Sequence, residues 1–180
     1  KLELSSLISI TDGSEPVHYF ETQTFNEKFS KCGLKSNVIR PGFGMAEIVI
    51  MLSGCKEGLK GLCVDKNILE TEGKIKLLEY KEGDKNQKML VNLGSQMKRH
   101  EIIIRDMGNN SLPEGFVGEL MVSGPSVAKG YFENENDTEK IFRQKIKGKE
   151  NFFLATGDSA LLWEKNLYFT GRIKDIIIIR

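Results

Sequence analysis

Three short stretches of the sequence combine residue types that bind nucleotides and metal ions. The first is Pro41-Gly42-Phe43-Gly44-Met45-Ala46-Glu47. Two glycines around an aromatic residue let the backbone approach a flat ligand, and Phe43 offers a face on which that ligand stacks. Glu47 supplies a hard oxygen ligand of the kind that suits Mg²⁺. An acidic residue at the start of a helix also complements the helix dipole without any metal, so both interpretations stay open for this stretch alone.

The other two stretches lie in the last thirty residues. In Ala155-Thr156-Gly157-Asp158 a strand ends and a carboxylate follows the glycine. A carboxylate placed there accepts hydrogen bonds from the two vicinal hydroxyls of a ribose. In the stretch from Thr170 to Asp175, Arg172 has the charge to hold a ribose or phosphate oxygen. Taken singly, each stretch is also explained as an ordinary turn, a Gly-Asp turn in one case and a charged hairpin turn in the other.

Composition narrows the class of protein. The 180 residues are enough for one good-sized core or two small ones, and 39% are hydrophobic and 28% charged, as in ordinary globular proteins. Lys and Arg number 26 against 25 Asp and Glu, a net charge of +1. This balance predicts no nucleic-acid partner and no basic membrane-binding surface. The longest apolar run, near residues 176–179, is far too short for stable insertion across a bilayer.

The cysteines and the two ends of the sequence point to the compartment and to the boundaries of the chain. The cysteines lack the paired spacing of a zinc site and are expected to be reduced thiols of a cytoplasmic protein. They are Cys32, Cys55 and Cys63. The sequence begins with Lys1 and ends at Arg180 in a strand-like run. A strand of that kind at a terminus predicts a segment taken from a longer protein.

Residues 1–55 read as the C-terminal part of an α/β subdomain. A strand is expected at Leu7–Thr11 and a helix from Val17 to a stop at Gly33. A second strand follows at Val38-Ile39, and a second helix is expected over Met45–Leu52. Alternation of strand and helix is typical of a mostly parallel layer.

Residues 56–175 read as a β-rich subdomain, and 176–180 as the start of a further segment. Closely spaced strands with turn residues between them predict a small distorted barrel. The expected strands are Gly61–Val64, Lys74–Tyr80, Met89–Leu93, His100–Asp106, Gly118–Val122, Phe152–Ala155, Ala160–Trp163, Leu167–Thr170 and Ile176–Ile179. One helix is expected over Asp137–Lys145, capped by Asn136 or Asp137.

The order of the motifs resembles the adenylate-forming superfamily, which includes acyl-CoA synthetases, peptide-synthetase adenylation domains and luciferases. The P-G-F-G-M-A-E loop is followed by G-E-L-x-V-x-G-P-S-V-A-x-G-Y-F, then T-G-D, then Y-F-T-G-R-I-K-D. Together they cover residues 13–175, nearly the whole chain. The resemblance implies the end of that superfamily's large N-terminal domain up to its hinge.

The resemblance also implies roles for individual residues. The nucleotide-binding set comprises Gly13, Ser14, Glu15, Pro16, Phe43, Gly44, Met45, Ala46, Asp158 and Arg172. Within it, residues 13–16 line the adenine pocket, Phe43 stacks on adenine, and Asp158 and Arg172 hold the ribose. Glu47 matches the residue that binds the catalytic Mg²⁺ accompanying ATP. Asp175 matches the hinge about which a small C-terminal domain turns.

Details of spelling resemble one subfamily, the fatty acyl-AMP ligases. Most members of the superfamily carry threonine where this chain has Ala46. Alanine at this position, together with the form G-x-E-P-V at residues 13–17, resembles the fatty acyl-AMP ligases. Such enzymes activate a fatty acid with ATP as an acyl-adenylate and pass the acyl group to an acyl carrier protein. The subfamily has an extra segment packed on the large domain, for which Glu57–Lys88 is the candidate here.

The implied reaction is attack of a fatty carboxylate on the α-phosphorus of ATP, which needs positioning and charge neutralisation more than a protein nucleophile. The superfamily's phosphate-binding loop and its lysine-bearing C-terminal domain fall outside the sequence, so these 180 residues are expected to be inactive alone. Two alternatives stay open. The chain is a piece of an acyl-CoA synthetase, or it is a non-catalytic interaction domain that keeps the scaffold.

Overall fold

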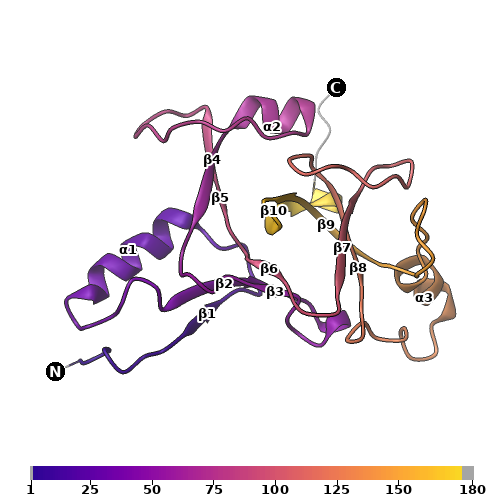
Figure 1. Cartoon of the computed structure of the whole chain (residues 1–180), viewed down its shortest axis with the longest axis horizontal. Helices are drawn as coiled ribbons and strands as arrows, with labels where there is room; N and C mark the ends of the chain where they lie inside the picture. The colour runs from indigo at the N-terminus through magenta and orange to yellow at the C-terminus, as the bar shows by residue number, and fades with distance from the viewer. Residues whose placement is uncertain (1, 176–180) are drawn as a thin grey trace.

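The computed structural model describes residues 2–175, and of Asp175 only the backbone (Figure 1). Its elements are β1 (Ile10–Asp12), α1 (Tyr19–Ser30), β2 (Ile39–Phe43), the 3-10 turn η1 (Ala46–Ile48), β3 (Ser53–Gly54), β4 (Gly61–Asp65), α2 (Lys66–Glu72), β5 (Gln87–Val91), β6 (Ser95–Gln96), β7 (Glu101–Arg105), β8 (Gly118–Ser123), α3 (Glu135–Phe142), β9 (Leu154–Trp163), β10 (Asn166–Arg172) and the 3-10 turn η2 (Ile173–Asp175). The strand expected at Ile176–Ile179 and the segment 176–180 lie outside the described residues. Within residues 2–175 no helix is long and apolar enough to cross a bilayer.

The first sheet has the strand order β1-β2-β3-β6. Strands β1 and β2 are parallel and are joined through α1, so this part is a β-α-β unit as predicted. The helix lacks a side-chain cap at its start and is followed by Gly33 in the left-handed region, with φ at 87°.

The helix expected over Met45–Leu52 is wrong. Only η1 is helical there, and Val49 and Ile50, which follow it, have φ of 54° and 80°. The reason is that β2 and β3 pair antiparallel, with Phe43 opposite Ser53. The chain must therefore reverse direction between these two residues, which a continuous helix does not allow. Left-handed backbone at β-branched residues is uncommon and marks a constrained loop.

The second sheet has the strand order β10-β9-β8-β7 and is antiparallel throughout. A ribbon of β4 and β5 continues it, through a bridge between Asn92 and Tyr168 and a hydrogen bond of 2.9 Å from Leu93 N to Leu167 O. The expectation of an α/β part followed by a β-rich part is confirmed. Within the described residues the β-rich part is a curled open arrangement whose strands do not close into a complete barrel.

Several element boundaries differ from those expected, each for a local reason. The two strands predicted between residues 152 and 163 form one strand, β9, because a bulge at Gly157 (φ 72°) lets it continue. Helix α2 was not predicted, although Asp65 accepts a capping bond from Ile68 N. Helix α3 is capped by Asn134 rather than by the two residues expected.

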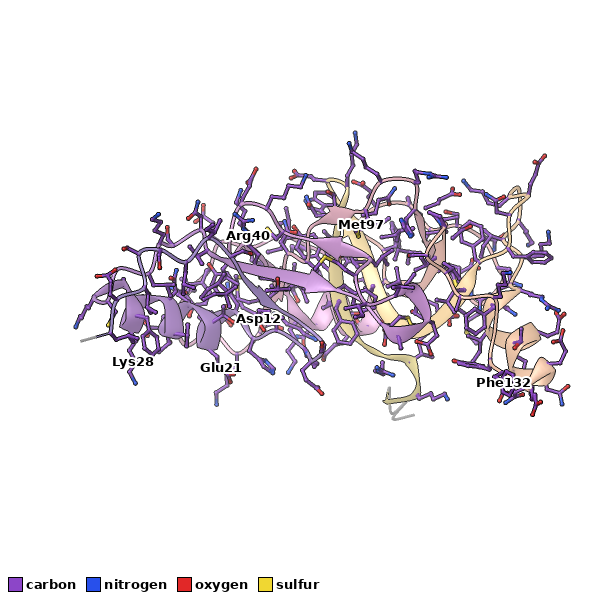
Figure 2. The ribbon with its side chains drawn as sticks, turned by 90° about the horizontal axis from the view of Figure 1, so that it is seen from below. Asp12, Glu21, Lys28, Arg40, Met97 and Phe132 are labelled. Atoms are coloured by element: carbon purple, nitrogen blue, oxygen red, sulfur yellow. The ribbon has the colours of Figure 1, made fainter. Side chains whose placement is uncertain are left out.

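The predicted strand Lys74–Tyr80 makes isolated bridges only, from Lys74 to Phe116 and from Leu77 to Val64. The molecule is elongated, with Lys28 of α1 near one end and Phe132 near the other (Figure 2).

The largest hydrophobic cluster lies where the two sheets meet. Ile48 and Leu52, from the loop between β2 and β3, have no exposed surface. They belong to the same cluster as Leu120 and Leu154 of the second sheet. Burial of whole aliphatic side chains there contributes about 1.5–3 kcal/mol each. The loop that carries Glu47 is therefore anchored on both sides and placed against the second sheet.

Candidate nucleotide-binding site

The glycine-rich loops meet at the carboxyl ends of the two parallel strands. Asp12, the last residue of β1, pairs with Pro41 of β2, so the segments that follow both strands emerge side by side. A Cβ atom added at Gly13 would lie 2.8 Å from the carbonyl oxygen of Gly42, so glycine allows this close approach. Ligands of open α/β sheets bind beyond the carboxyl ends of the strands. The predicted adenine-binding segment 13–16 and the 41–47 loop are thus brought together; Ser14, Glu15 and Pro16 are exposed.

The loop after β2 is closed tightly on itself. A Cβ at Gly44 would lie 1.3 Å from the carbonyl oxygen of Ile50, which no side chain tolerates. The carbonyl of Met45 accepts hydrogen bonds from the amides of Ile48 and Ile50, both at 3.1 Å. Phe43 is half-buried at the end of β2, while Ala46 is exposed. The backbone of this loop is consequently defined by its own hydrogen bonds and leaves the Phe43 ring partly open to a ligand.

Glu47 is held by a loop from a distant part of the chain. Its carboxylate oxygen Oε1 accepts a hydrogen bond of 2.8 Å from the hydroxyl of Tyr131, and its backbone carbonyl accepts one of 2.8 Å from the amide of Ala128. Burial, followed by the bond to Glu47, raises the pKa of Tyr131 to about 12. The phenol therefore stays protonated and is the donor in this pair.

Asp158 lies in the bulge of β9 and is nearly buried, with 4% of its surface exposed. Its amide donates to the hydroxyl of Thr156 at 3.0 Å, and that hydroxyl donates to the carbonyl of Leu120 at 2.9 Å. Asp158 pairs in register with Arg172 of β10. The predicted ribose-binding pair is therefore adjacent.

The electrostatics of Asp158 favour a polar ligand. Its Oδ1 lies 3.1 Å from Nε of Arg172, an ion pair between β9 and β10. This buried oxygen has no hydrogen-bond partner within the described residues. Burial raises the pKa of Asp158, the Arg172 charge opposes that rise, and the negative charges of Glu119 and Glu47 add to it. A buried carboxylate oxygen that accepts no hydrogen bond within the described residues fits a ribose hydroxyl.

Glu119 and Arg105 hold the backbone next to Asp158 in place, and the sequence did not predict this role. Nε of Arg105 donates to Glu119 Oε2 at 2.9 Å, and Gly157 N donates to Glu119 Oε1 at 3.3 Å. Arg105 and Glu119 lie opposite each other on β7 and β8, so the ion pair fixes the bulge from the neighbouring strand. Cross-strand pairing predicts such contacts once the register is known, and the register was not readable from the sequence.

The carboxylate of Glu47 is a hard oxygen ligand of the kind that Mg²⁺ prefers. Within residues 2–175 no group of three or more potential metal ligands gathers. Mg²⁺ keeps several waters and is commonly held by one or two carboxylates plus the phosphates of its nucleotide, so a lone half-buried glutamate suffices. Asp175, which is predicted to be a hinge residue, is the last residue of η2, and its side chain is outside the described residues.

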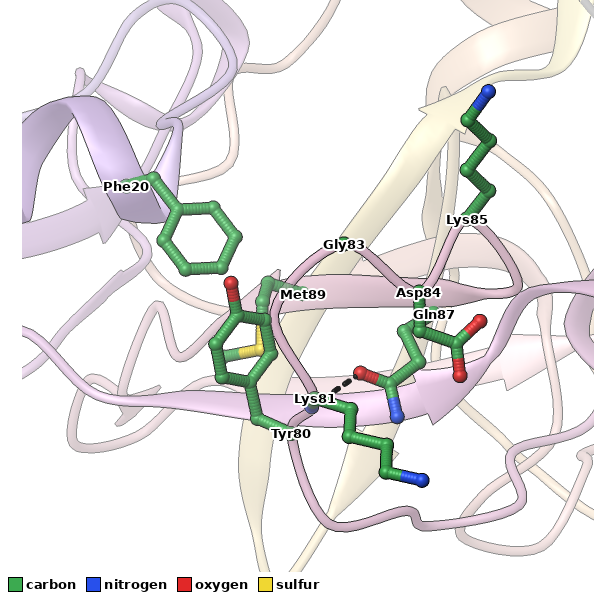
Figure 3. Close-up of a pocket in the computed structure, with 8 residues that line it drawn as sticks. All are labelled: Phe20, Tyr80, Lys81, Gly83, Asp84, Lys85, Gln87 and Met89. Atoms are coloured by element: carbon green, nitrogen blue, oxygen red, sulfur yellow. Dashed lines mark hydrogen bonds between the residues drawn. The ribbon is translucent and has the colours of Figure 1, made fainter.

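One cavity lies away from the candidate nucleotide site and another lies beside the Asp158–Arg172 pair. One, of about 310 Å³, lies between α1 and the approach to β5 (Figure 3) and is lined by Phe20, Tyr80, Lys81, Gly83, Asp84, Lys85, Gln87 and Met89. Its Phe20 and Tyr80 rings are 5.2 Å apart. None of the residues expected at the nucleotide lines it. The other, of about 430 Å³, includes Glu119, Ser159 and Ile173, which flank the Asp158–Arg172 pair.

The β-α-β unit with its glycine loops, joined to a curled antiparallel sheet that carries the Asp–Arg pair, defines the adenylate-forming fold. An adenylation domain of a keto acid-selecting peptide-synthetase module shares it, with 28% identity and a TM-score of 0.86 over 98% of this chain and 33% of its own. No family model matches the chain.

Within that class the similarity is to fatty acyl-AMP ligases. A fatty acyl-adenylate ligase from L. pneumophila, solved with acyl adenylate and pyrophosphate, is 31% identical with a TM-score of 0.88 over 98% of this chain and 31% of its own. The medium-chain-fatty-acid–[acyl-carrier-protein] ligase JamA of Moorena producens is 31% identical over 99% of this chain. The 4-hydroxyphenylalkanoate adenylyltransferase of Mycobacterium tuberculosis is 30% identical over 99%. The chain spans about three tenths of the length of these relatives. The predicted resemblance is confirmed.

Proposed function

We propose that the complete gene product is a fatty acyl-AMP ligase and that these residues form the adenosine-binding part of its active site. The observation that carries the proposal is the buried carboxylate of Asp158, in a chain similar to acyl-adenylate-forming enzymes. Its Oδ1 is ion-paired with Arg172 at 3.1 Å but accepts no hydrogen bond within the described residues. A buried carboxylate oxygen without a partner is costly unless a ligand satisfies it.

The nucleotide is held by the two sheets together. The backbone of residues 13–16 borders adenine, Phe43 stacks on it, and residues 44–46 complete this part of the binding loop. Asp158 accepts hydrogen bonds from the ribose hydroxyls, while Arg172, two-thirds exposed, reaches a ribose oxygen. Asp175, which follows η2, is proposed as the hinge.

In the reaction, an oxygen of the fatty carboxylate attacks the α-phosphorus of ATP, the bond from that phosphorus to the bridging oxygen breaks, and pyrophosphate leaves. Asp158, Arg172 and Phe43 contribute by fixing the adenosine so that the α-phosphate faces the incoming carboxylate. Glu47 is the residue that would hold Mg²⁺, and the ion when bound neutralises phosphate charge.

The acceptor of the acyl group is proposed to be an acyl carrier protein. Two relatives are named as acyl-carrier-protein ligases. Residues 57–88, which include β4, α2 and the first two residues of β5, are proposed as the extra segment of this subfamily. A cytoplasmic location is part of the same proposal, because ATP is the substrate and the three cysteines are free thiols.

Exchange of radiolabelled pyrophosphate into ATP by the complete gene product tests adenylation. We expect exchange that depends on added fatty acid and that Asp158→Asn lowers, whereas the matched Asp84→Asn, at an exposed turn residue of the cavity beside α1, leaves it unchanged. Absence of exchange with fatty acids, aryl acids and keto acids alike would leave the non-catalytic scaffold as the better reading.

The acceptor is tested separately. With fatty acid and ATP, the enzyme is given either a phosphopantetheinylated acyl carrier protein or coenzyme A. We expect the acyl group on the carrier protein. Efficient formation of acyl-CoA instead would replace this part of the proposal by an acyl-CoA synthetase and leave adenylation intact.

A further inference from the structure

Glu47 lies in the short turn η1, which is too short to fix the direction of the Glu47 side chain by itself. The turn η1 has three residues and is followed at once by two left-handed residues, Val49 and Ile50. One isolated 3-10 turn has poor hydrogen-bond geometry and little stiffness. The position of the carboxylate must therefore be set from outside the turn.

The outside brace is the segment Gly124–Tyr131, which we call the bracing loop. It contacts Glu47 twice, through the amide of Ala128 to the backbone carbonyl and through the hydroxyl of Tyr131 to Oε1. Residues 47 and 131 are 84 positions apart, so the contact exists only in the folded chain.

The bracing loop is itself fixed at both ends. At its start, Nε2 of His100 lies 2.7 Å from the hydroxyl of Ser126, and the His100 ring fills the space that a Cβ on Gly124 would need. At its end, the amide of Tyr131 donates to the hydroxyl of Thr138 in α3 at 2.9 Å. The Tyr131 ring packs edge-on against Phe142, with centroids 5.1 Å apart. These contacts at both ends of the bracing loop fix the position of the Tyr131 hydroxyl.

We propose that Tyr131 is a positioning residue that occupies Oε1 of Glu47 and so directs Oε2 alone toward the divalent cation of the nucleotide. This inference rests on the proposed function of Glu47 as the cation ligand. Within the described residues Oε2 accepts no hydrogen bond. Partners that orient a metal ligand typically matter by 10–100-fold in metal affinity or activity.

The test is Tyr131→Phe in the complete gene product, which removes the hydroxyl and keeps the ring against Phe142. Free Mn²⁺ is titrated by electron paramagnetic resonance in the presence of a non-hydrolysable ATP analogue. We expect about 10-fold weaker Mn²⁺ binding and an equal rise in the Mg²⁺ concentration for half-maximal pyrophosphate exchange. The matched control is Tyr80→Phe, at an exposed tyrosine lining the cavity beside α1.

A double-mutant cycle with Glu47→Gln separates positioning from a general structural role. If Tyr131 acts through the carboxylate, Tyr131→Phe weakens Mn²⁺ binding in the wild-type background and changes it little in the Glu47→Gln background. Unchanged Mn²⁺ affinity in Tyr131→Phe, or equal losses in both backgrounds, overturns the proposal. Lack of fatty acid-dependent exchange in the wild type overturns the proposed function instead, since the Mn²⁺ titration reads the Tyr131–Glu47 pair without any turnover.

Discussion

The two sheets contribute to the site in different ways. The first has strands of three, five, two and two residues, and its candidate site residues lie at the end of β2 and in the glycine-containing loops after β1 and β2, with the side chains of Phe43 and Glu47 among them. The second has strands of seven, ten, six and five residues, and it presents the Asp158–Arg172 pair. The candidate residues of the first sheet are therefore held by loop backbone, and those of the second by long paired strands.

The difference extends to packing. In the first region Ile8 and Ile50 are 81% and 76% exposed, whereas Leu120 and Leu161 of the second sheet have no exposed surface. We propose on this ground that residues 1–55 and 56–175 are separate subdomains of unequal stability, although Ile48 and Leu52 are buried in the cluster they share.

Limited proteolysis of the 180-residue chain should show the largest contrast. Local opening free energies range from near zero up to that of global unfolding, so residues 1–55 are expected to be cleaved well before residues 118–172. Mass spectrometry of early fragments locates the cuts. Early cleavage throughout 118–172 would remove the distinction between the regions.

Gly44→Ala tests the close-packed backbone of the first region. The new Cβ would fall 1.3 Å from the carbonyl oxygen of Ile50, so the loop must rearrange at a cost of about 3 kcal/mol. We expect fatty acid-dependent pyrophosphate exchange to fall at least about 100-fold. Gly54→Ala is the matched control, because no atom lies within 4 Å of its added Cβ and its backbone is not left-handed. Equal effects of the two substitutions would contradict the role of the loop.

Asp158→Asn tests the charged contribution of the second region. Hydrogen bonds to a charged acceptor contribute about 1.5–3 kcal/mol, so ATP affinity should fall by about 10- to 100-fold. Equilibrium binding of a fluorescent ATP analogue to the complete gene product measures it. Retention of affinity within twofold would mean that the ribose lies elsewhere.

The two regions also differed in how far the sequence predicted them. Asp158 and Arg172 lie on consecutive strands of a hairpin, so their meeting follows from local pairing. The Tyr131–Glu47 contact joins residues that are 84 positions apart, so no pattern of neighbouring residues in the sequence predicts it. The helix predicted over residues 45–52 is wrong for a similar reason, because contacts between distant residues decide the structure there. Its apolar spacing suits a helix, but the antiparallel pairing of β2 with β3, a tertiary constraint, overrides that preference.

The smallest expected effect is on stability, and it has a definite sign. Because burial raises the pKa of Asp158 above its ordinary value of 3.8, folding favours its protonated form. The associated stabilisation is fully present below the unfolded-state pKa and is lost as pH rises through the higher folded-state pKa. At neutral pH the charged, buried Asp158 therefore costs stability, and Asp158→Asn should raise Tm by about 2–4 °C, equivalent to roughly 1 kcal/mol.

That gain should shrink as pH falls toward the unfolded-state pKa. Thermal unfolding of wild type and variant across that range measures it. Asp106→Asn should show the opposite dependence of stability on pH, because the pKa of Asp106 is lowered rather than raised. Bonds from Asn110, its side chain first, lower the pKa of the Asp106 carboxyl, so its contribution is present at neutral pH and lost as pH falls. An Asp158→Asn protein less stable than wild type at neutral pH would mean that Arg172 outweighs burial. The site would then be a structural ion pair rather than an acceptor left open for a ligand.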